Sequence, residues 1–273
     1  MSWLGKSSEG GIPMKYQTLV LSKKGKIAIV SLNRPDVHNA MDEAMMKELT
    51  ACFKELSKDA SSQIIVLTGS GRSFCAGADL TWMKKMVKYK KEENKKDSHI
   101  LLELFETVAS CPKPIIGRIN GPAFGGGIGL LAACDITISA TDNKFGFSEV
   151  NLGIIPAVIS SYVAPRMTPA DMKRLFLTGE RFDAATAHDI GLIDIVVPPE
   201  RFDATVDYYI EQLLNSGPQA MKEVKLLIKN LMEMDPKKFK EFSVEKIAEL
   251  RVSKEGQEGI TAFLEKRKPK WVE

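Results

Sequence analysis

The feature that most constrains the fold of this chain is the alternation of short β-branched runs with stretches of helical periodicity. Helical spacing is clearest at residues 42–56, where Asp42 is a suitable N-cap. Strands that alternate with helices predict an α/β core with largely parallel strands. The runs that are bounded by turn-forming residues and have the length of buried strands are residues 26–32, 63–69, 114–120, 135–140 and 193–197.

The character of the sequence changes near residue 200, after two consecutive prolines. Beyond them the chain shows amphipathic helical patterns with little strand signal, at residues 202–214, 219–232, 236–252 and 256–268. We therefore expect a leader at residues 1–13, a core at 14–200 and a helical region at 201–273. Helices so rich in apolar faces bury them on their own core or on a neighbouring subunit.

Composition bounds the class of protein. The chain has 273 residues, of which 44% are hydrophobic, enough for one large domain or a domain with an appended lobe. Its net charge of +3 argues against a nucleic-acid or membrane partner as a bulk property. No apolar run reaches the roughly 20 residues of a membrane-spanning helix. The three histidines lack metal-ligand neighbours, so we expect no metal.

The cysteines predict the compartment. They lie scattered with no paired spacing, which is typical of a reducing, cytoplasmic environment and leaves an organellar matrix open. They are Cys52, Cys75, Cys111 and Cys134.

The most charged stretch is Lys84–Lys96. One interpretation is a solvated helix or loop. The other is an electrostatic surface for a polyanion or for the phosphates of coenzyme A. A polyanion-binding or scaffold protein that uses this surface is the competing hypothesis from outside the enzymes.

Two segments rich in small residues follow predicted strands. Phe74–Leu80 (FCAGADL) comes after the strand at 63–69, and residues 120–131 (NGPAFGGGIGLL) come after the strand at 114–120. Small residues at a strand end allow a ligand to approach the backbone. The second segment leads into a helical pattern, whose first N–H groups have no partner within the helix.

One N–H group from each segment could hold the oxygen of a thioester enolate. Preorganised donors of this kind lower a barrier by about 2.7–4 kcal/mol each. The ordinary alternative is a pair of structural turns, since glycine-rich turns are common at strand ends. The sequence contains no complete dinucleotide fingerprint, no P-loop and no GxSxG nucleophile motif.

A carboxylate in an apolar neighbourhood is the third element. Glu149 lies in the segment KFGFSEVNLGIIP at residues 144–156. Apolar surroundings raise a carboxyl pKa and suit it to proton transfer near neutral pH. A carboxylate that caps a turn or pairs with a lysine is an equally open interpretation.

Together these segments resemble the crotonase superfamily, also called the enoyl-CoA hydratase/isomerase family. The resemblance runs from about residue 16 to the C-terminus. It is carried by LNRPDVHNAM (32–41), FCAGADL (74–80), NGPAFGGGIGLLAACD (120–135), FGFSEVNLGIIP (145–156), LTGERFDAATAHDIGLID (177–194) and EGITAFLEKRKPKW (258–271).

The resemblance implies a core of repeated ββα turns in a spiral, followed by a helical region used in trimer formation. It implies homotrimers or hexamers, and an acyl-CoA substrate with no separate cofactor, because coenzyme A is part of the substrate. The lysine and arginine residues at 266–268 would then meet CoA phosphates. Matched residue by residue, the thioester oxygen is held by the N–H groups of Ala78 and Gly126, proton transfer falls to Glu149, and the substrate path includes Ala76, Ala78, Asp79, Leu80, Thr81, Gly126 and Gly129.

Gly129 is where the chain departs from the family pattern. Two-glutamate hydratases carry their first glutamate at that position, so Glu149 has no partner. Adding water across a C=C bond needs water activated at Cβ and a proton at Cα, which two carboxylates share. Moving a double bond needs a single base, so this argument favours a Δ3,Δ2-enoyl-CoA isomerase with Glu149 as the proton shuttle.

A finer resemblance favours hydration instead. GGGIGL together with SEVNLGIIPAVIS is similar to a branch described as methylglutaconyl-CoA hydratase, of leucine breakdown. We therefore expect an enoyl-CoA hydratase acting on a 2-enoyl-CoA, with 3-methylglutaconyl-CoA as the candidate, and an acyl pocket that is enlarged by the small residue at 129. The isomerase remains the alternative.

Three further residues each have two interpretations. Cys75 adjoins the first loop and is either a buried thiol or a nucleophile. His38 faces a CoA phosphate or lies on the surface. Arg166 pairs with an extra substrate carboxylate or forms a structural salt bridge.

Overall fold

The computed structural model describes residues 16–272, so the expected leader at 1–13 lies outside the described residues. Its main sheet has the order β1-β2-β3-β4-β6-β9. The strands are β1 (Leu19–Lys24), β2 (Ile27–Leu32), β3 (Ile64–Gly69), β4 (Ile115–Ile119), β6 (Ile136–Ala140) and β9 (Ile195–Val197). All five predicted strands are confirmed, and they pair in parallel. β1, which was not predicted, adds antiparallel to β2.

Both faces of the main sheet are covered, and period-two alternation assigns the side chains to each face. In β3, Ile65 and Leu67 join the larger apolar cluster, while Ile64 and Val66 join a smaller one. The larger cluster contains residues of α1 (Glu43–Lys58), α3 (Lys91–Ala109) and α4 (Gly126–Ala132); the smaller contains α8 (Pro199–Leu214). Because β3 is buried on both faces, its sequence is a nearly continuous apolar run, as expected for a strand of a parallel sheet.

The predicted N-cap at Asp42 is confirmed, because its carboxylate accepts the N–H of Met45 at 2.9 Å and α1 begins at the next residue. A second, small sheet was not predicted. It has the order β5-β7-β8, formed by Ala123–Phe124, Lys144–Gly146 and Arg181–Asp183. The remaining helices of the core are α2 (Leu80–Met86), α5 (Ala157–Val163), α6 (Pro169–Thr178), α7 (Ala184–Asp189) and the short turns η1 (Pro35–Val37) and η2 (Glu149–Leu152).

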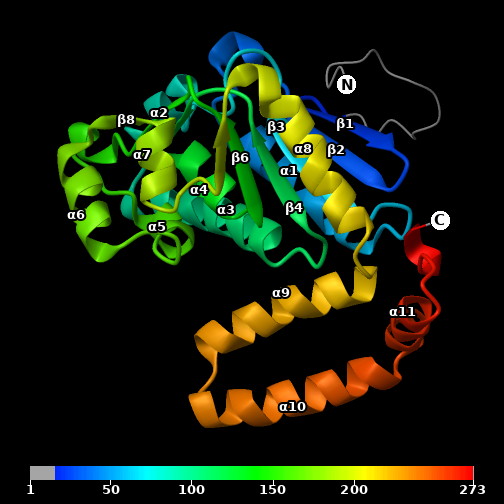
Figure 1. Cartoon of the computed structure of the whole chain (residues 1–273). Helices are drawn as coiled ribbons and strands as arrows, with labels where there is room; N and C mark the ends of the chain where they lie inside the picture. The colour runs from blue at the N-terminus through cyan, green and yellow to red at the C-terminus, as the bar shows by residue number, and fades with distance from the viewer. Residues whose placement is uncertain (1–15, 273) are drawn as a thin grey trace.

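The four C-terminal helical patterns are all helices. After α8 come α9 (Pro218–Glu233), α10 (Pro236–Val252) and α11 (Lys254–Leu264), with a last turn η3 (Lys270–Val272). Because Phe202, Val206 and Ile210 of α8 pack on the main sheet, α8 belongs to the core. The boundary expected near residue 200 therefore falls later, and the part that extends away from the core begins with α9 (Figure 1).

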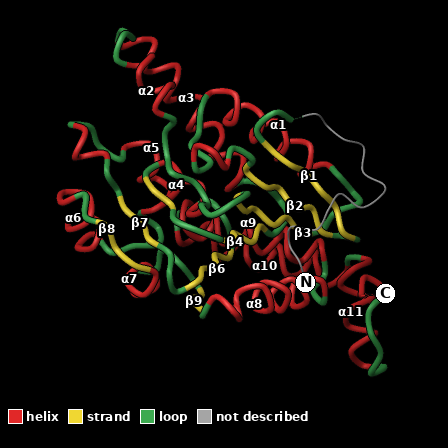
Figure 2. The backbone as a smooth tube through the Cα atoms, turned by 90° about the horizontal axis from the view of Figure 1, so that it is seen from above, coloured by secondary structure: helices red, strands yellow, loops and turns green. Residues whose placement is uncertain are grey.

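The lysine-rich stretch Lys84–Lys96 spans the end of α2, a turn and the first residues of α3. All of its lysines are exposed, and Figure 2 shows the α2–α3 turn at the edge of the molecule. Within residues 16–272, none of the helices combines the length and apolar character that a bilayer crossing requires.

Candidate active site

The two loops singled out in the sequence lie against each other. Cys75 and Ala123 form a parallel bridge, and the N–H of Phe124 donates to the carbonyl of Cys75 at 3.0 Å. Gly77 has φ +90°, and a Cβ built on it would lie 2.8 Å from the carbonyl oxygen of Phe124 and 3.8 Å from the nitrogen of Gly126. Only glycine permits this conformation together with so close an approach.

The two expected oxyanion donors meet at this contact. Ala78 bridges Met41, but the hydrogen bonds of that bridge use the carbonyl of Gly77 and the N–H of Asp79. Gly126 is the first residue of α4, where an N–H has no intrahelical partner. Among residues 16–272, neither Ala78 nor Gly126 donates its N–H to a recorded acceptor. Ala78 is exposed and Gly126 half-buried, so both are accessible to a ligand.

The carboxylate of Glu149 lies beside this pair. Gly125, with φ +48°, immediately precedes the donor Gly126, and a Cβ built on it would lie 3.2 Å from Oε1 of Glu149. The other oxygen, Oε2, is buried and has no hydrogen-bond partner within the described residues. Burial raises the pKa of Glu149 above its ordinary value. A desolvated carboxylate with one unpartnered oxygen, beside the glycine that precedes Gly126, is suited to proton transfer.

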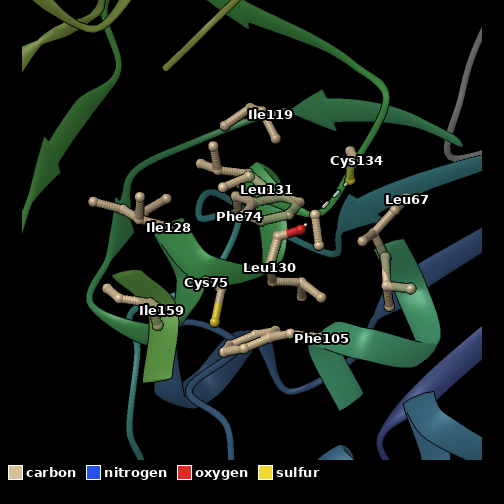
Figure 3. Close-up of a cluster of buried hydrophobic side chains, with 14 of the residues drawn as sticks. Leu67, Phe74, Cys75, Phe105, Ile119, Ile128, Leu130, Leu131, Cys134 and Ile159 are labelled. Carbon is tan, nitrogen blue, oxygen red and sulfur yellow. Dashed lines mark hydrogen bonds between the residues drawn. The ribbon is translucent and has the colours of Figure 1, made fainter. Parts of the chain in front are cut away.

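The space beside Gly129 is already filled, which corrects the expectation of an enlarged acyl pocket. A Cβ on this buried glycine would lie 2.5 Å from Cγ2 of Ile159 and 2.8 Å from Cζ of Phe105. Figure 3 shows these two side chains beside α4, within the apolar cluster. Gly129 thus packs α4 against α3 and α5, and it does not present an open face to a substrate.

Residues 76–81 divide into two groups. Leu80 and Thr81 are exposed like Ala78, and Ala76 is half-buried. The Asp79 side chain instead points inward, where it accepts the N–H groups of Thr81 and Trp82 and caps α2. The ligand path expected along this segment therefore fits its exposed members, whereas the carboxylate of Asp79 serves the fold.

A cavity of about 550 Å³ adjoins the two loops and brings His38 together with two arginines, Arg72 and Arg181, that sequence reasoning missed. Its lining includes His38, Arg72, Ala76, Phe124 and Arg181. Arg72 precedes the first loop by two residues, whereas Arg181 lies far along the chain, at the start of β8. The two side chains come together only in the folded protein. The guanidinium of Arg181 stacks 5.1 Å from the centre of the Phe124 ring. Two guanidinium groups, those of Arg72 and Arg181, thus line the same cavity as Ala76.

The structure decides between the interpretations of Cys75. The thiol is fully buried, and burial raises its pKa to about 12. A nucleophilic cysteine needs a lowered pKa, so Cys75 is a packing residue.

The Arg166 side chain is engaged by the fold. It donates to the carbonyls of Ala132 and Cys134 at the end of α4 and pairs with Asp194 at 3.2 Å. These contacts match the structural salt bridge and leave the guanidinium unavailable for a substrate carboxylate.

Among residues 16–272, no three His, Cys, Asp or Glu side chains gather as a group that suits a metal ion.

Among the basic residues at 266–268, which the resemblance assigns to CoA phosphates, Arg267 pairs with Glu258 and Glu265, both at 2.7 Å.

Known proteins with similar sequences include enoyl-CoA hydratases. The chain is 33% identical to a short-chain-enoyl-CoA hydratase of Clostridium acetobutylicum, an alignment that covers 93% of this chain and 97% of the relative. It is 31% identical to a crotonyl-CoA hydratase of Syntrophomonas wolfei, covering 95% and 99%.

The fold comparison gives the same result. A crystal structure of an enoyl-CoA hydratase from Shewanella pealeana superposes with a TM-score of 0.90 at 39% identity, over 94% of this chain and 97% of the other. The sequence model of the enoyl-CoA hydratase/isomerase family matches residues 22–273. With this match over nearly the whole chain and the site described above, the protein belongs to the enoyl-CoA hydratase/isomerase family.

Proposed function

We propose that the chain hydrates a 2-enoyl-CoA thioester, with the N–H groups of Ala78 and Gly126 as the oxyanion hole and Glu149 as the group that moves protons. The observation that carries this proposal is the buried, unpartnered carboxylate oxygen of Glu149 next to Gly125. The names of the relatives support the reaction class.

The chemistry follows from polarisation of the thioester. Donors at Ala78 and Gly126 stabilise negative charge on the carbonyl oxygen, which makes C3 electrophilic and favours an enolate. Glu149 removes a proton from water as the oxygen bonds to C3, and the C=C electrons shift onto the thioester as an enolate. The same carboxyl then delivers a proton to C2, which leaves a neutral 3-hydroxyacyl-CoA and an ionised Glu149.

Substituting Glu149 tests this role. Glu149→Gln keeps the size of the side chain but removes its ability to exchange a proton. We expect kcat to fall by about 10²–10⁴-fold, as is usual for loss of a general acid–base group. The measurement is the loss of the conjugated enoyl-thioester absorbance. Hydration by the variant at the wild-type rate would exclude Glu149 from the chemistry.

A second candidate is the Δ3,Δ2-enoyl-CoA isomerase, and one specific observation favours it. Ile159 and Phe105 occupy the space beside Gly129, where a second carboxylate would be needed to hold water from the other side. A single base suffices to remove a proton from C2 and return it at C4.

The products separate the two reactions. A hydratase converts a 2-enoyl-CoA into a product 18 mass units heavier, because one water is added. An isomerase converts a 3-enoyl-CoA into a conjugated product of unchanged mass. Mass spectrometry of both incubations distinguishes them, and activity with neither substrate contradicts both candidates.

For the acyl group, our proposal is 3-methylglutaconyl-CoA, supported by the motifs GGGIGL and SEVNLGIIPAVIS. The two structural grounds expected for it are absent, since the space at Gly129 is filled and Arg166 is engaged. A direct comparison of this dicarboxylic substrate with 3-methylcrotonyl-CoA tests the proposal. A higher kcat/KM for 3-methylglutaconyl-CoA supports it, and equal or lower values overturn it.

The cationic cavity fits the phosphates of the coenzyme. His38, Arg72 and Arg181 lie beside Ala76, on the ligand path that runs to Ala78. Guanidinium groups recognise phosphate through paired hydrogen bonds. We include CoA phosphate binding at this cavity in the proposal, with a rise in KM and little change in kcat as the expected effect of Arg72→Ala.

Self-association completes the proposal. Apolar side chains on the C-terminal helices face solvent in the single chain, among them Leu231, Val244 and Phe263, which are 58%, 66% and 82% exposed. Exposed apolar surface of this extent is typical of an interface between subunits. A trimer or a hexamer of this chain would bury it.

A further inference from the structure

We propose that Met41 is the positioning residue that sets the distance between the two oxyanion donors. Met41 precedes α1 and lies outside both glycine-containing loops. It is nevertheless the point at which the two loops are held together, through its backbone on one side and its side chain on the other. This inference rests on the proposed role of Ala78 and Gly126.

The backbone of Met41 fixes the first donor. Its N–H donates to the carbonyl of Gly77 at 2.7 Å, and its carbonyl accepts the N–H of Asp79 at 2.9 Å. These two bonds hold the chain on both sides of Ala78. In a parallel bridge of this kind the bonds go to the residues before and after the central one, so the N–H of Ala78 stays free.

The side chain of Met41 fixes the second donor. It is 2% exposed, and a Cβ built on Gly126 would lie 2.5 Å from its Cε. Apart from the chain neighbours of Gly126 and the backbone of α4, Met41 Cε is the sole atom of residues 16–272 within 4 Å of that built Cβ. The methyl group therefore packs on the face of Gly126 where any other residue would carry its side chain.

Met41 is itself held by charged groups on either side of it. The Arg34 guanidinium donates to the carbonyl of Ala40 at 2.5 Å and pairs with Asp42 at 3.1 Å. It also pairs with Asp79 at 2.9 Å. One cation thus ties the segment before α1 to the segment after Ala78, which limits movement of Met41.

This arrangement has a specific consequence for the reaction. If Met41 shifts, both N–H donors remain in the molecule but their separation changes. Misplacement by about 1 Å can cost roughly 100-fold in rate. Binding of the CoA part uses other residues, so the loss falls on kcat and on polarisation of the thioester while KM changes little.

The experiment compares Met41→Leu and Met41→Ala with Met46→Leu as the control. Met46 is fully buried in the same apolar cluster, but it lies in α1 and has no recorded contact with Gly126. The first readout is the infrared carbonyl stretch of bound butanoyl-CoA that carries ¹³C at the thioester carbon. This saturated probe does not react and reports directly on the oxyanion hole. The second readout is kcat and KM for hydration or isomerisation.

We expect the wild type and Met46→Leu to lower the frequency of the bound carbonyl equally. Met41→Leu should recover part of the frequency of free ligand, with kcat reduced about 10–100-fold and KM within about threefold. Met41→Ala should show a larger effect of the same kind. If folded Met41→Leu keeps the wild-type shift and kcat, or loses them only as much as Met46→Leu, the inference is overturned.

A double-mutant cycle with Gly126→Ala provides an independent test of the contact between the Met41 side chain and Gly126. In the wild-type background the new Cβ displaces the Met41 methyl group. In the Met41→Ala background that clash is gone, so we expect a smaller additional loss of kcat from Gly126→Ala. Equal losses in the two backgrounds contradict the contact.

Failure of the inference can be told from failure of the proposed function. If the wild type itself produces no shift of the bound carbonyl, Ala78 and Gly126 are not an oxyanion hole, and both proposals fail. If the wild type shifts the carbonyl while the Met41 variants behave as the control does, only the inference fails.

Discussion

Glu149 is the residue in which burial and proposed chemistry are most directly linked. Its carboxyl is desolvated, and this raises its pKa above the ordinary glutamate value of about 4.3. A base acts only when ionised, so kcat/KM should fall on the acid side through the raised pKa of the free enzyme. The acid limb of the pH–rate profile is expected above pH 4.3, and a limb at or below that value contradicts the burial argument.

Stability gives an independent prediction for the same residue. Between the unfolded and the raised folded pKa, the native state binds more protons than the unfolded state, so stability falls as pH rises through that window. At neutral pH the native state bears the cost of a buried, unpartnered carboxylate oxygen.

Glu149→Gln should therefore raise the thermal stability at pH 7, by about 2–4 °C for each kcal/mol of penalty removed. The gain should shrink towards pH 4, where the wild-type carboxyl is protonated. Differential scanning calorimetry of both proteins at the two pH values, at equal protein concentration, tests this. An equal or lower Tm for the variant at pH 7 counts against it.

At the scale of the elements, the packing of α4 against α3 and α5 depends on Gly129. Gly129→Ala would place a Cβ within 2.8 Å of both Ile159 and Phe105. Overpacking of a buried site costs about 1–3 kcal/mol of unfolding free energy. Urea denaturation should show a loss of this size, and the loss should be smaller in an Ile159→Ala background, where Cγ2 is removed. If Gly129→Ala unfolds at the same urea concentration as the wild type, α5 moves freely away from α4 and the prediction is wrong.

The elements also show what the sequence could reveal. The central strands β3, β4 and β6 were predictable because they are almost entirely buried and consist of continuous apolar runs, whereas β1, most of whose residues are exposed, was missed. β5, β7 and β8 were not predicted, because strands of two or three residues carry no periodicity of their own; β9 is as short, but it lies in the apolar run at residues 193–197. The expected donors Ala78 and Gly126 came from the family resemblance of two motifs at strand ends, and the loops that carry these motifs lie against each other.

What the sequence could not reveal are contacts between distant segments. Absence of a side chain at Gly129 was visible, but the filling of that space by Ile159 and Phe105 was not. Met41 ends the motif LNRPDVHNAM, but the sequence did not indicate its positioning role, because its contacts with Gly77, Asp79 and Gly126 exist only in the folded chain.

At the scale of the whole molecule, the C-terminal helices extend from a core that is complete after α8 (Figure 1). Their exposed apolar residues are the basis for proposing self-association. Phe263→Glu places a charge where the side chain is 82% exposed in the single chain. Burying that charge in an interface is costly, so we expect the assembled mass to fall in light scattering. Val87→Glu, at a position 87% exposed on the α2–α3 turn, is the control. Equal masses for wild type and Phe263→Glu exclude this surface as an interface.

The fold brings the two loops of the proposed oxyanion pair close to the carboxylate of Glu149, and both candidate reactions move a proton at C2. The most direct test is incorporation of deuterium into carbon when 2-butenoyl-CoA and 3-butenoyl-CoA are incubated in heavy water and analysed by mass spectrometry. Hydration of 2-butenoyl-CoA places deuterium at C2, whereas isomerisation of 3-butenoyl-CoA places it at C4. We predict that the wild type introduces deuterium at one of these carbons with at least one of the substrates, and that Glu149→Gln does so at least about 100-fold more slowly. Absence of exchange in the wild type, or equal exchange in Glu149→Gln, contradicts the account.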